Sequence, residues 1–261
     1  MKNKENNNKL IFGMIALFTL IILMFLVAKY NTPYYKVESR KEKLIEEKKK
    51  RKETVLAWLR VQGTNIDYPI IYNSDEYDIN KINDYDFLWN NAKSKVLRNA
   101  PTIFGHNIQN LSTTPSYDKE YGRFENLLNF VYSDFVTKNK YIQYTIDNKD
   151  YLYKIFSVSF IETKNLSYAR YNLEKNELKS YIKGSIYDSI YKFDIDVDDS
   201  DKIISLVTCT RLLGNNTNYD FKIDARLVRK NENITNYSFK ETKKYSKIKS
   251  ILKGDGNNEK A

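Results

Sequence analysis

The chain of 261 residues contains one cysteine and one histidine, and each follows an apolar run that has the pattern of a strand. Cys209 closes the β-branched run 203–209, and His106 comes shortly after the apolar run 102–104. A thiol with a pKa of about 8.5 is mostly protonated at neutral pH, and a nearby imidazole or guanidinium raises its thiolate fraction. Attack of a cysteine on an amide also needs an acid for the leaving amine and a donor for the oxyanion. Cys209, His106 and an arginine would meet these needs, and Arg211 lies in the loop directly after the cysteine.

Each of these residues also has an ordinary structural explanation. A free cysteine is commonly buried in a core, and a single histidine is commonly a surface or capping residue. Arg226 and Arg229, further along the chain, are equally explained as solvated charges. Because one cysteine and one histidine can form neither an intrachain disulfide nor a four-ligand zinc site, we expect no metal and no cofactor.

Strand patterns dominate the middle of the chain, and helical patterns occupy the connections. An alternating segment around Pro69 is followed by strand candidates at 102–104, 141–146, 151–161, 203–209 and 221–228. Helices are predicted at 122–130, 133–139 and 173–191, and residues 147–150 predict a hairpin turn. Since strands and helices do not alternate as in a βαβ fold, the pattern favours a mostly β domain, an antiparallel β-barrel with helical insertions.

The N-terminal part carries an uncharged, predominantly apolar run of 19 residues, 10–28. A helix of this length rises about 28 Å, which matches one hydrocarbon core, whereas the apolar core of a signal peptide is shorter. We therefore predict a transmembrane signal-anchor, with residues 1–9 as a cytoplasmic N-terminus. The charged stretch 36–60 is helix-like, and we expect 29–54 to form a stalk helix, with the apolar residues 55–59 docking its end on the domain.

The net charge of +10 first suggests a polyanion-binding protein. Counted by segment, however, residues 1–60 carry +8, residues 229–261 carry +5, and residues 61–228 carry −3. The excess is therefore terminal, and we expect no nucleic-acid partner. The basic tail 231–261 lacks extended apolar periodicity, and we expect it to be disordered or loosely helical.

Four segments, in matching order, resemble those of the sortase family. Ser-Leu-Val-Thr-Cys at 205–209 is similar to the family's T-L-x-T-C signature, with serine in place of the usual threonine, and Ile-Phe-Gly-His-Asn at 103–107 resembles the strand that ends in G-H-N. The segment 57–70 (AWLRVQGTNIDYPI) resembles the opening segment of class B sortases, and residues 183–188 are similar to their K-S-x-Y-D pattern. The resemblance points to class B and places a sortase catalytic domain at 55–230.

This resemblance implies a sortase-type β-barrel of eight antiparallel or mixed strands and a cysteine transpeptidase of a Gram-positive bacterium. Cys209 would attack the threonine carbonyl of a C-terminal sorting signal on a secreted protein. His106 would protonate the leaving amine and later deprotonate the incoming one. The incoming amine would belong to a cell-wall peptidoglycan precursor or, as an alternative, to a pilin lysine.

The resemblance also bears on orientation. The positive-inside count alone favours a cytoplasmic location for the basic residues 36–52. Because sortases work outside the cell, the resemblance implies instead a single-pass cell-membrane protein with its N-terminus in the cytoplasm and its catalytic domain outside.

The sequence departs from the family at the third catalytic residue. Sortases usually place an arginine at the start of the strand after the cysteine loop, where this chain has Tyr219 or Asp220. Arg211 is the preferred substitute, and Arg226 is a second candidate if the strand register differs. An aspartate at position 220 would repel the oxyanion and could raise the pKa of the imidazole. Without a donor, the chain would instead be a catalytically impaired, sortase-fold binding module at the cell surface.

Overall fold

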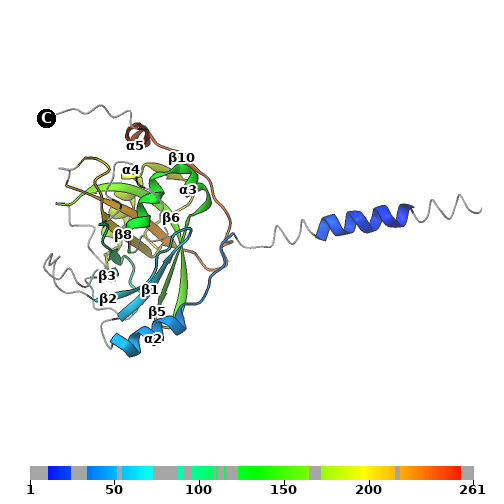
Figure 1. Ribbon diagram of the computed structural model, residues 1–261, viewed down its shortest axis with the longest axis horizontal. Coiled ribbons are helices and arrows are strands. Elements are labelled where there is room, and N and C mark those ends of the chain that lie inside the picture. The colour runs from blue at the N-terminus through cyan, green and yellow to red at the C-terminus, as the bar shows by residue number, and fades with distance from the viewer. Residues whose placement is uncertain are drawn as a thin grey trace, which may run out of the picture. The chain divides into compact units, whose positions relative to one another are not determined.

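The computed structural model describes much of the chain between residues 11 and 253 (Figure 1). The chain divides into two compact units, of which the first comprises Met1–Lys36 with Asn233–Thr235 and the second comprises Val37–Glu232 with Asn236–Ala261. The described residues are 11–24, 34–51, 55–72, 88–90, 96–108, 110, 115, 123–164, 172–214 and 218–253.

A closed barrel forms the second unit's centre. Its strands follow the order β1-β2-β3-β4-β8-β9-β6-β5, and β1 pairs with β5 to close it. Neighbouring strands are antiparallel except in the pairs β2–β3 and β4–β8. The predicted eight-stranded mixed barrel is confirmed. The strands are β1 (Val55–Val61), β2 (Asp67–Tyr72), β3 (Leu88–Asn90), β4 (Thr102–Phe104), β5 (Tyr141–Ile146), β6 (Lys149–Glu162), β8 (Ile203–Cys209) and β9 (Tyr219–Leu227).

The two faces of the β8–β9–β6 part of the sheet differ in chemistry. Leu206, Ile223 and Val158 lie in neighbouring positions and are completely buried in the barrel core. Because side chains alternate along a strand, the residues next to them point outward. On that outer face β9 carries charged residues, such as Asp224, which lies opposite Ser205 of β8. Cys209 also lies on this outer face, since it comes four residues after Ser205 on the same strand.

Helix α4 (Lys175–Asp188) covers part of the outer face and is held there by a buried polar cluster. The Tyr181 hydroxyl donates to Asp224 Oδ1 at 2.9 Å and lies 2.8 Å from Ser205 Oγ. Lys222 Nζ lies 3.0 Å from Asp224 Oδ2 and 3.2 Å from Ser185 Oγ. Such a cluster is directional, so it fixes where the helix sits on the strands as well as covering them.

Residues 55–59 are a strand, so the expectation that they continue the preceding helix is wrong. Helix α2 spans Lys41–Arg51, and Leu44 on it is buried against Val55 and Trp58 of β1. The strand is thus apolar on both faces, one toward the barrel core and one toward α2, and the run of apolar residues lacks the alternation typical of a half-buried strand. Of the predicted stalk 29–54, the helix 41–51 therefore packs on the barrel, while 29–33 and 52–54 lie outside the described residues.

The tail 231–261, expected to be disordered or loosely helical, is not disordered up to residue 253, where it contains both a strand and a helix. Strand β10 (Phe239–Glu241) pairs with β7 (Tyr191–Phe193), and helix α5 (Lys243–Leu252) follows it. Tyr245 and Ile248 of α5 are 4% and 3% exposed and belong to the same core cluster as the barrel. A few widely spaced aromatic and aliphatic residues therefore anchor a segment that its composition marks as polar. Residues 254–261 lie outside the described part.

The remaining predicted connections agree with the structure. The 3-10 helix η3 (Glu125–Val131), α3 (Ser133–Lys138) and α4 lie within or close to the predicted helices. The hairpin between β5 and β6 turns at Asp147 and Asn148, whose φ values of 52° and 53° are typical of a two-residue hairpin turn.

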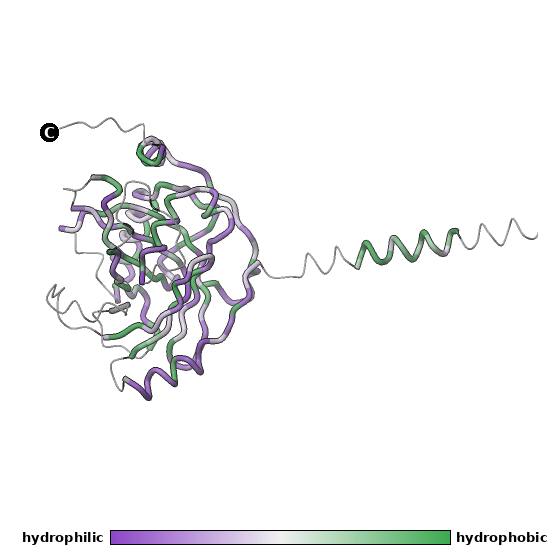
Figure 2. The backbone as a smooth tube through the Cα atoms, viewed as in Figure 1, coloured by the Kyte–Doolittle hydropathy of each residue, from purple (hydrophilic) through white to green (hydrophobic). Residues whose placement is uncertain are grey.

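Residues 11–24 form a helix in the first unit, and Figure 2 shows it as largely hydrophobic. Its large apolar side chains are exposed. The predicted span 10–28 extends past this helix at both ends, into residues that lie outside the described part of the chain. Residues 1–9 also lie outside it. Within the described part of the chain we find no helix both long and apolar enough to cross a membrane. The signal-anchor therefore stays a prediction.

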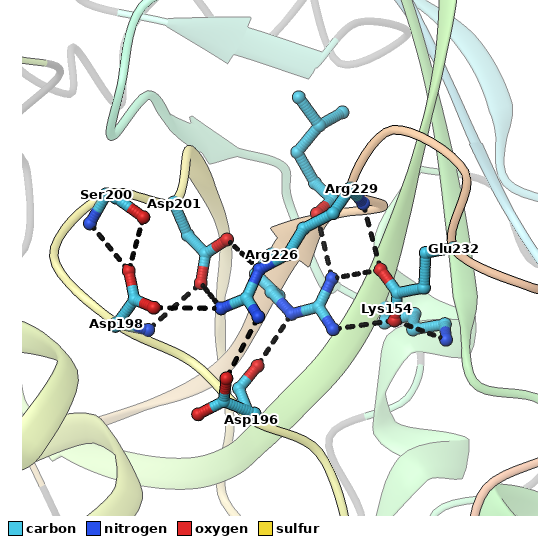
Figure 3. A network of polar contacts seen from close by, with 9 residues as sticks. Lys154, Asp196, Asp198, Ser200, Asp201, Arg226, Arg229 and Glu232 are labelled. Carbon is cyan, nitrogen blue, oxygen red and sulfur yellow. Dashed lines mark hydrogen bonds and ion pairs between the residues drawn. The ribbon is translucent and has the colours of Figure 1, made fainter.

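An ion-pair network ties the far end of β9 to the loop before β8 (Figure 3). Arg226 makes two hydrogen bonds to Glu232, at 2.6 and 2.7 Å, and Lys154 Nζ donates to the same carboxylate at 2.7 Å. The neighbouring Arg229 contacts three carboxylates, those of Asp196, Asp198 and Asp201. The loop that leads into the cysteine strand is thereby fixed by the guanidinium of Arg229.

We predict that Glu232→Gln destabilises the fold by about 3 kcal/mol, because it leaves the buried charges of Arg226 and Lys154 without their carboxylate. Burial would raise the pKa of Glu232, but the hydrogen bonds from Arg226 and Lys154 outweigh it and lower the pKa to about 2. The contribution is therefore present above the unfolded-state pKa of about 4.3 and is lost as the pH falls toward 2. Urea unfolding at neutral and acid pH measures both effects.

Glu241→Gln is the matched control, since Glu241 pairs with Lys249 at 3.4 Å and is partly exposed. It should change the free energy of unfolding by less than about 0.5 kcal/mol. A similarly small change for Glu232→Gln contradicts the prediction.

Candidate active site

The parallel pairing of β4 with β8 brings the histidine and the cysteine together. Ile103 lies opposite Leu206 and Phe104 opposite Val207, and the pairing continues as the Gly105 amide donates to the Val207 carbonyl at 3.2 Å. If the register continues for two more residues, His106 lies level with Cys209. Because both strands run in the same direction, these two residues leave the barrel at the same edge. The sequence prediction that they share one site therefore agrees with the topology.

Asn107 secures this edge. Its Nδ2 donates to the Cys209 carbonyl at 3.0 Å and to the Asn110 carbonyl at 3.0 Å, and its Oδ1 accepts from the Asn110 amide at 3.1 Å. Thr208 Oγ1 donates to the Gly105 carbonyl at 2.7 Å, one residue before the cysteine. The sequence alone does not predict this role for Asn107, although it adjoins His106. Its buried amide links the loop after the histidine to the backbone of the nucleophile.

The Cys209 thiol is exposed and lies directly across from Asp220 on the adjacent strand β9. The surrounding protein limits hydration of the thiolate, and the Asp220 carboxylate repels it, so the pKa of Cys209 is raised to about 11. Arg211 acts in the opposite direction and favours the thiolate. At neutral pH the resting side chain is therefore a thiol.

The His106 imidazole is also uncharged at neutral pH. Burial and, next, the charge of Arg123 lower its pKa below the usual value of 6.5. The Phe124 amide donates to the His106 carbonyl at 3.2 Å, which brings Arg123 close to the histidine, and Arg123 has a left-handed φ of 49°. The sequence carries no signal for this contact, because Arg123 lies on a separate connection. The expectation that Asp220 raises the imidazole pKa is wrong, since the imidazole pKa moves the other way.

The three arginine candidates fall into two groups. Arg226 lies opposite Ile203 at the start of β8, so it is at the opposite end of the strand from Cys209, and its guanidinium is bound to Glu232. Arg229 is bound to the aspartates of the loop before β8. Only Arg211 of these three acts on the thiol, and its side chain is exposed at the start of the loop after β8. The geometry thus leaves Arg211 as the candidate oxyanion donor and puts Asp220 at the position where an arginine was expected.

Comparisons with known proteins agree with this architecture. The chain is 25% identical over 177 residues to the curated sortase B of Listeria monocytogenes, and the match spans 61% of this chain and 64% of that protein. The X-ray structure of Clostridium perfringens sortase B has a TM-score of 0.56 and 23% identity, and the match covers 71% of this chain and all of that one. The chain has the class B sortase fold.

A further sortase B structure, of a complex with triglycine, has a TM-score of 0.56 and 18% identity and matches 79% of this chain and 92% of its own. No family model matches the chain. The resemblance of the sequence motifs to class B sortases is confirmed by the curated relative and by these structures. Within this fold, Cys209 ends β8 and His106 follows the end of β4 by two residues. Among the described residues, no group of three or more His, Cys, Asp or Glu side chains is placed to hold a metal ion.

We predict that alkylation of Cys209 by iodoacetamide accelerates about tenfold per pH unit from pH 7 upward, because the thiolate is the reacting form and its pKa is about 11. Asp220→Asn should shift the rate profile to lower pH, and Arg211→Ala should shift it to higher pH. Mass spectrometry of the modified chain gives the rates, and Cys209→Ala supplies the blank. A plateau below about pH 8 contradicts the raised pKa.

Proposed function

We propose that this chain is a cysteine transpeptidase that cleaves the C-terminal sorting signal of secreted proteins and joins the acyl group to an amine of cell-wall peptidoglycan. The observation that carries the proposal is the β4–β8 pairing, which brings to one edge an exposed Cys209 at the end of β8 and His106 two residues after the end of β4. The similarity to sortase B of Listeria monocytogenes supports the reaction class. That match spans less than two thirds of the relative, so the activity is proposed from the site.

In the first step, both reacting groups start uncharged. The neutral imidazole of His106 accepts the thiol proton while Sγ of Cys209 attacks the threonine carbonyl of the sorting signal. The guanidinium of Arg211 stabilises the oxyanion, which it can reach because it lies two residues after the nucleophile. The imidazolium then gives its proton to the leaving amine, and a thioester remains on Cys209.

In the second step, an incoming amine attacks this thioester. The lowered pKa of His106 suits this step, because a neutral imidazole is ready to accept the proton that the amine loses. One similar sortase B was crystallised with triglycine, a peptide that carries a primary amine. We propose an acceptor of this chemical class for this chain, in the form of the amine on a peptidoglycan cross-bridge.

We predict that the full-length chain in detergent cleaves quenched sorting-signal peptides and that hydroxylamine increases the rate. Cys209→Ala should abolish cleavage, and Arg211→Ala should lower kcat about 10²- to 10³-fold with little change in KM, because it removes an oxyanion donor. Arg98→Ala is the matched control, since Arg98 is exposed and lies before the start of β4, at the end of the strand away from His106. Cleavage that survives Cys209→Ala contradicts the mechanism.

The second candidate function is a catalytically impaired binding module of the same fold. The observation that favours it is Asp220 opposite the thiol, together with the raised pKa of Cys209. It predicts binding of sorting-signal peptides by the full-length chain without cleavage and without an acyl-enzyme detectable by mass spectrometry. The same peptides therefore distinguish the two functions, because the transpeptidase cleaves them and the binding module only binds them.

We also propose that the chain is anchored in the cell membrane through residues 10–28, with the N-terminus in the cytoplasm and the catalytic domain outside. The exposed apolar side chains of the helix 11–24 support an apolar environment for this segment. The proposed substrates, secreted proteins and cell-wall amines, also require the domain outside.

The single cysteine allows a direct test of this orientation. A membrane-impermeant maleimide applied to intact cells at mildly alkaline pH should label Cys209. In the double variant Cys209→Ala with Asn6→Cys, labelling should appear only after lysis. Labelling of the second variant, but not of the natural chain, on intact cells contradicts the proposed orientation.

A further inference from the structure

The residue across from the nucleophile carries a charge opposite to that of the arginine expected there. Asp220 pairs with Cys209 in the antiparallel β8–β9 ladder, and the two side chains project from the same face of the sheet. Directly opposed residues of such a pair have Cβ atoms about 5 Å apart. The carboxylate is only 9% exposed, while the thiol beside it reaches solvent. A cation bound between the two would therefore be partly desolvated, which strengthens its attraction to the carboxylate.

The neighbouring acidic residue is oriented differently. Glu162 of β6 lies opposite Tyr219, one residue along β9 from Asp220, so it projects from the other face. Its carboxylate pairs with Lys164 at 2.9 Å. Further down the outer face, Lys222 Nζ is directed to Asp224, Ser185 and Tyr181 beneath α4. Asp220 is thus the carboxylate that shares a face and a row with the thiol.

We propose that Asp220 binds the ammonium group of the acceptor and holds it beside the thioester on Cys209. This assignment rests on the proposed transpeptidase function. In a reactive arrangement the attacking nitrogen comes within about 3.5 Å of the thioester carbon, and that carbon is bonded to Sγ. A side chain of the sorting signal is displaced from the carbonyl by about 3.3 Å for each residue along an extended chain. Asp220 is therefore better placed to bind the attacking nitrogen than to bind a side chain of the cleaved sorting-signal peptide.

The step balances without another reactant. The docked ammonium releases one proton to water and becomes an amine. Its nitrogen then forms the N–C bond as the C–Sγ bond breaks, and it passes its second proton to the imidazole of His106. The imidazolium returns that proton to Sγ, so Cys209 is again a thiol.

Two nucleophiles that differ in charge test this assignment on the full-length chain. Triglycine carries an ammonium group at neutral pH, whereas hydroxylamine is uncharged. We expect Asp220→Asn to raise the KM for triglycine about tenfold, a change equivalent to losing about 1.4 kcal/mol of binding free energy. The KM for hydroxylamine should stay unchanged, because hydroxylamine carries no charge for the carboxylate to bind. Asp220→Glu, which keeps the charge, should keep the preference for triglycine.

Glu162→Gln is the matched control, because it neutralises a nearby carboxylate on the other face of the sheet, and it should leave both KM values unchanged. Equal changes for triglycine and hydroxylamine, no change for either, or a change only in the KM for the sorting-signal peptide would overturn the role of Asp220. Those outcomes leave the proposed transpeptidase standing, since the natural chain still cleaves. Absence of cleavage and of acyl-enzyme in the natural chain overturns the proposed function itself, and the assignment with it.

Discussion

The parallel pairing of β4 with β8 is the contact on which the site depends. His106 and Cys209 are far apart in the sequence, and neither helix packing nor a local turn brings them together. The ladder sets their relative position along the strands to within one residue, because a shift of β8 by one residue would turn Ser205 and Cys209 toward the core. The hydrogen bonds of Asn107 and Thr208 extend the same alignment past the end of the ladder. The loop carrying the histidine is thus tied to the backbone of the cysteine itself.

The electrostatics of the site keep both reacting groups uncharged. The pKa of each group is shifted in the direction that disfavours its charged form. Limited hydration and Asp220 raise the pKa of the thiol, whereas burial and Arg123 lower the pKa of the imidazole. A thiolate–imidazolium pair is therefore a minor form at neutral pH, and proton transfer has to accompany attack. Arg211 opposes this trend from the loop after β8, so its contribution is greatest when negative charge develops at the thiol or the oxyanion.

The site was accessible to sequence reasoning because its two central residues are unique in the chain and each follows an apolar strand. The short strands β3, β7 and β10 have three residues each, too few for a periodic signal. The run at 55–59 was misread because burial on two faces removes the alternation on which strand prediction relies. The tail sequence gives no clear signal for its strand and helix, because Tyr245 and Ile248 are isolated apolar anchors in a polar stretch. Arg123 and Asn107 were not assigned because their roles arise from contacts between connections, which no local pattern encodes.

The outer face of β8 and β9 has to satisfy two opposing demands. It must be covered for most of its length, yet it must leave the thiol in contact with solvent at its end. An apolar covering helix would favour continued burial toward Cys209, whereas the cluster of Lys222, Asp224 and Tyr181 fixes α4 through directional contacts at defined rows. A buried ion pair adds little net stability over apolar packing of the same volume, so its value here lies in position. The polar contacts of α4 described above therefore end one row before the last row of the ladder, and that last row contains Cys209 and Asp220.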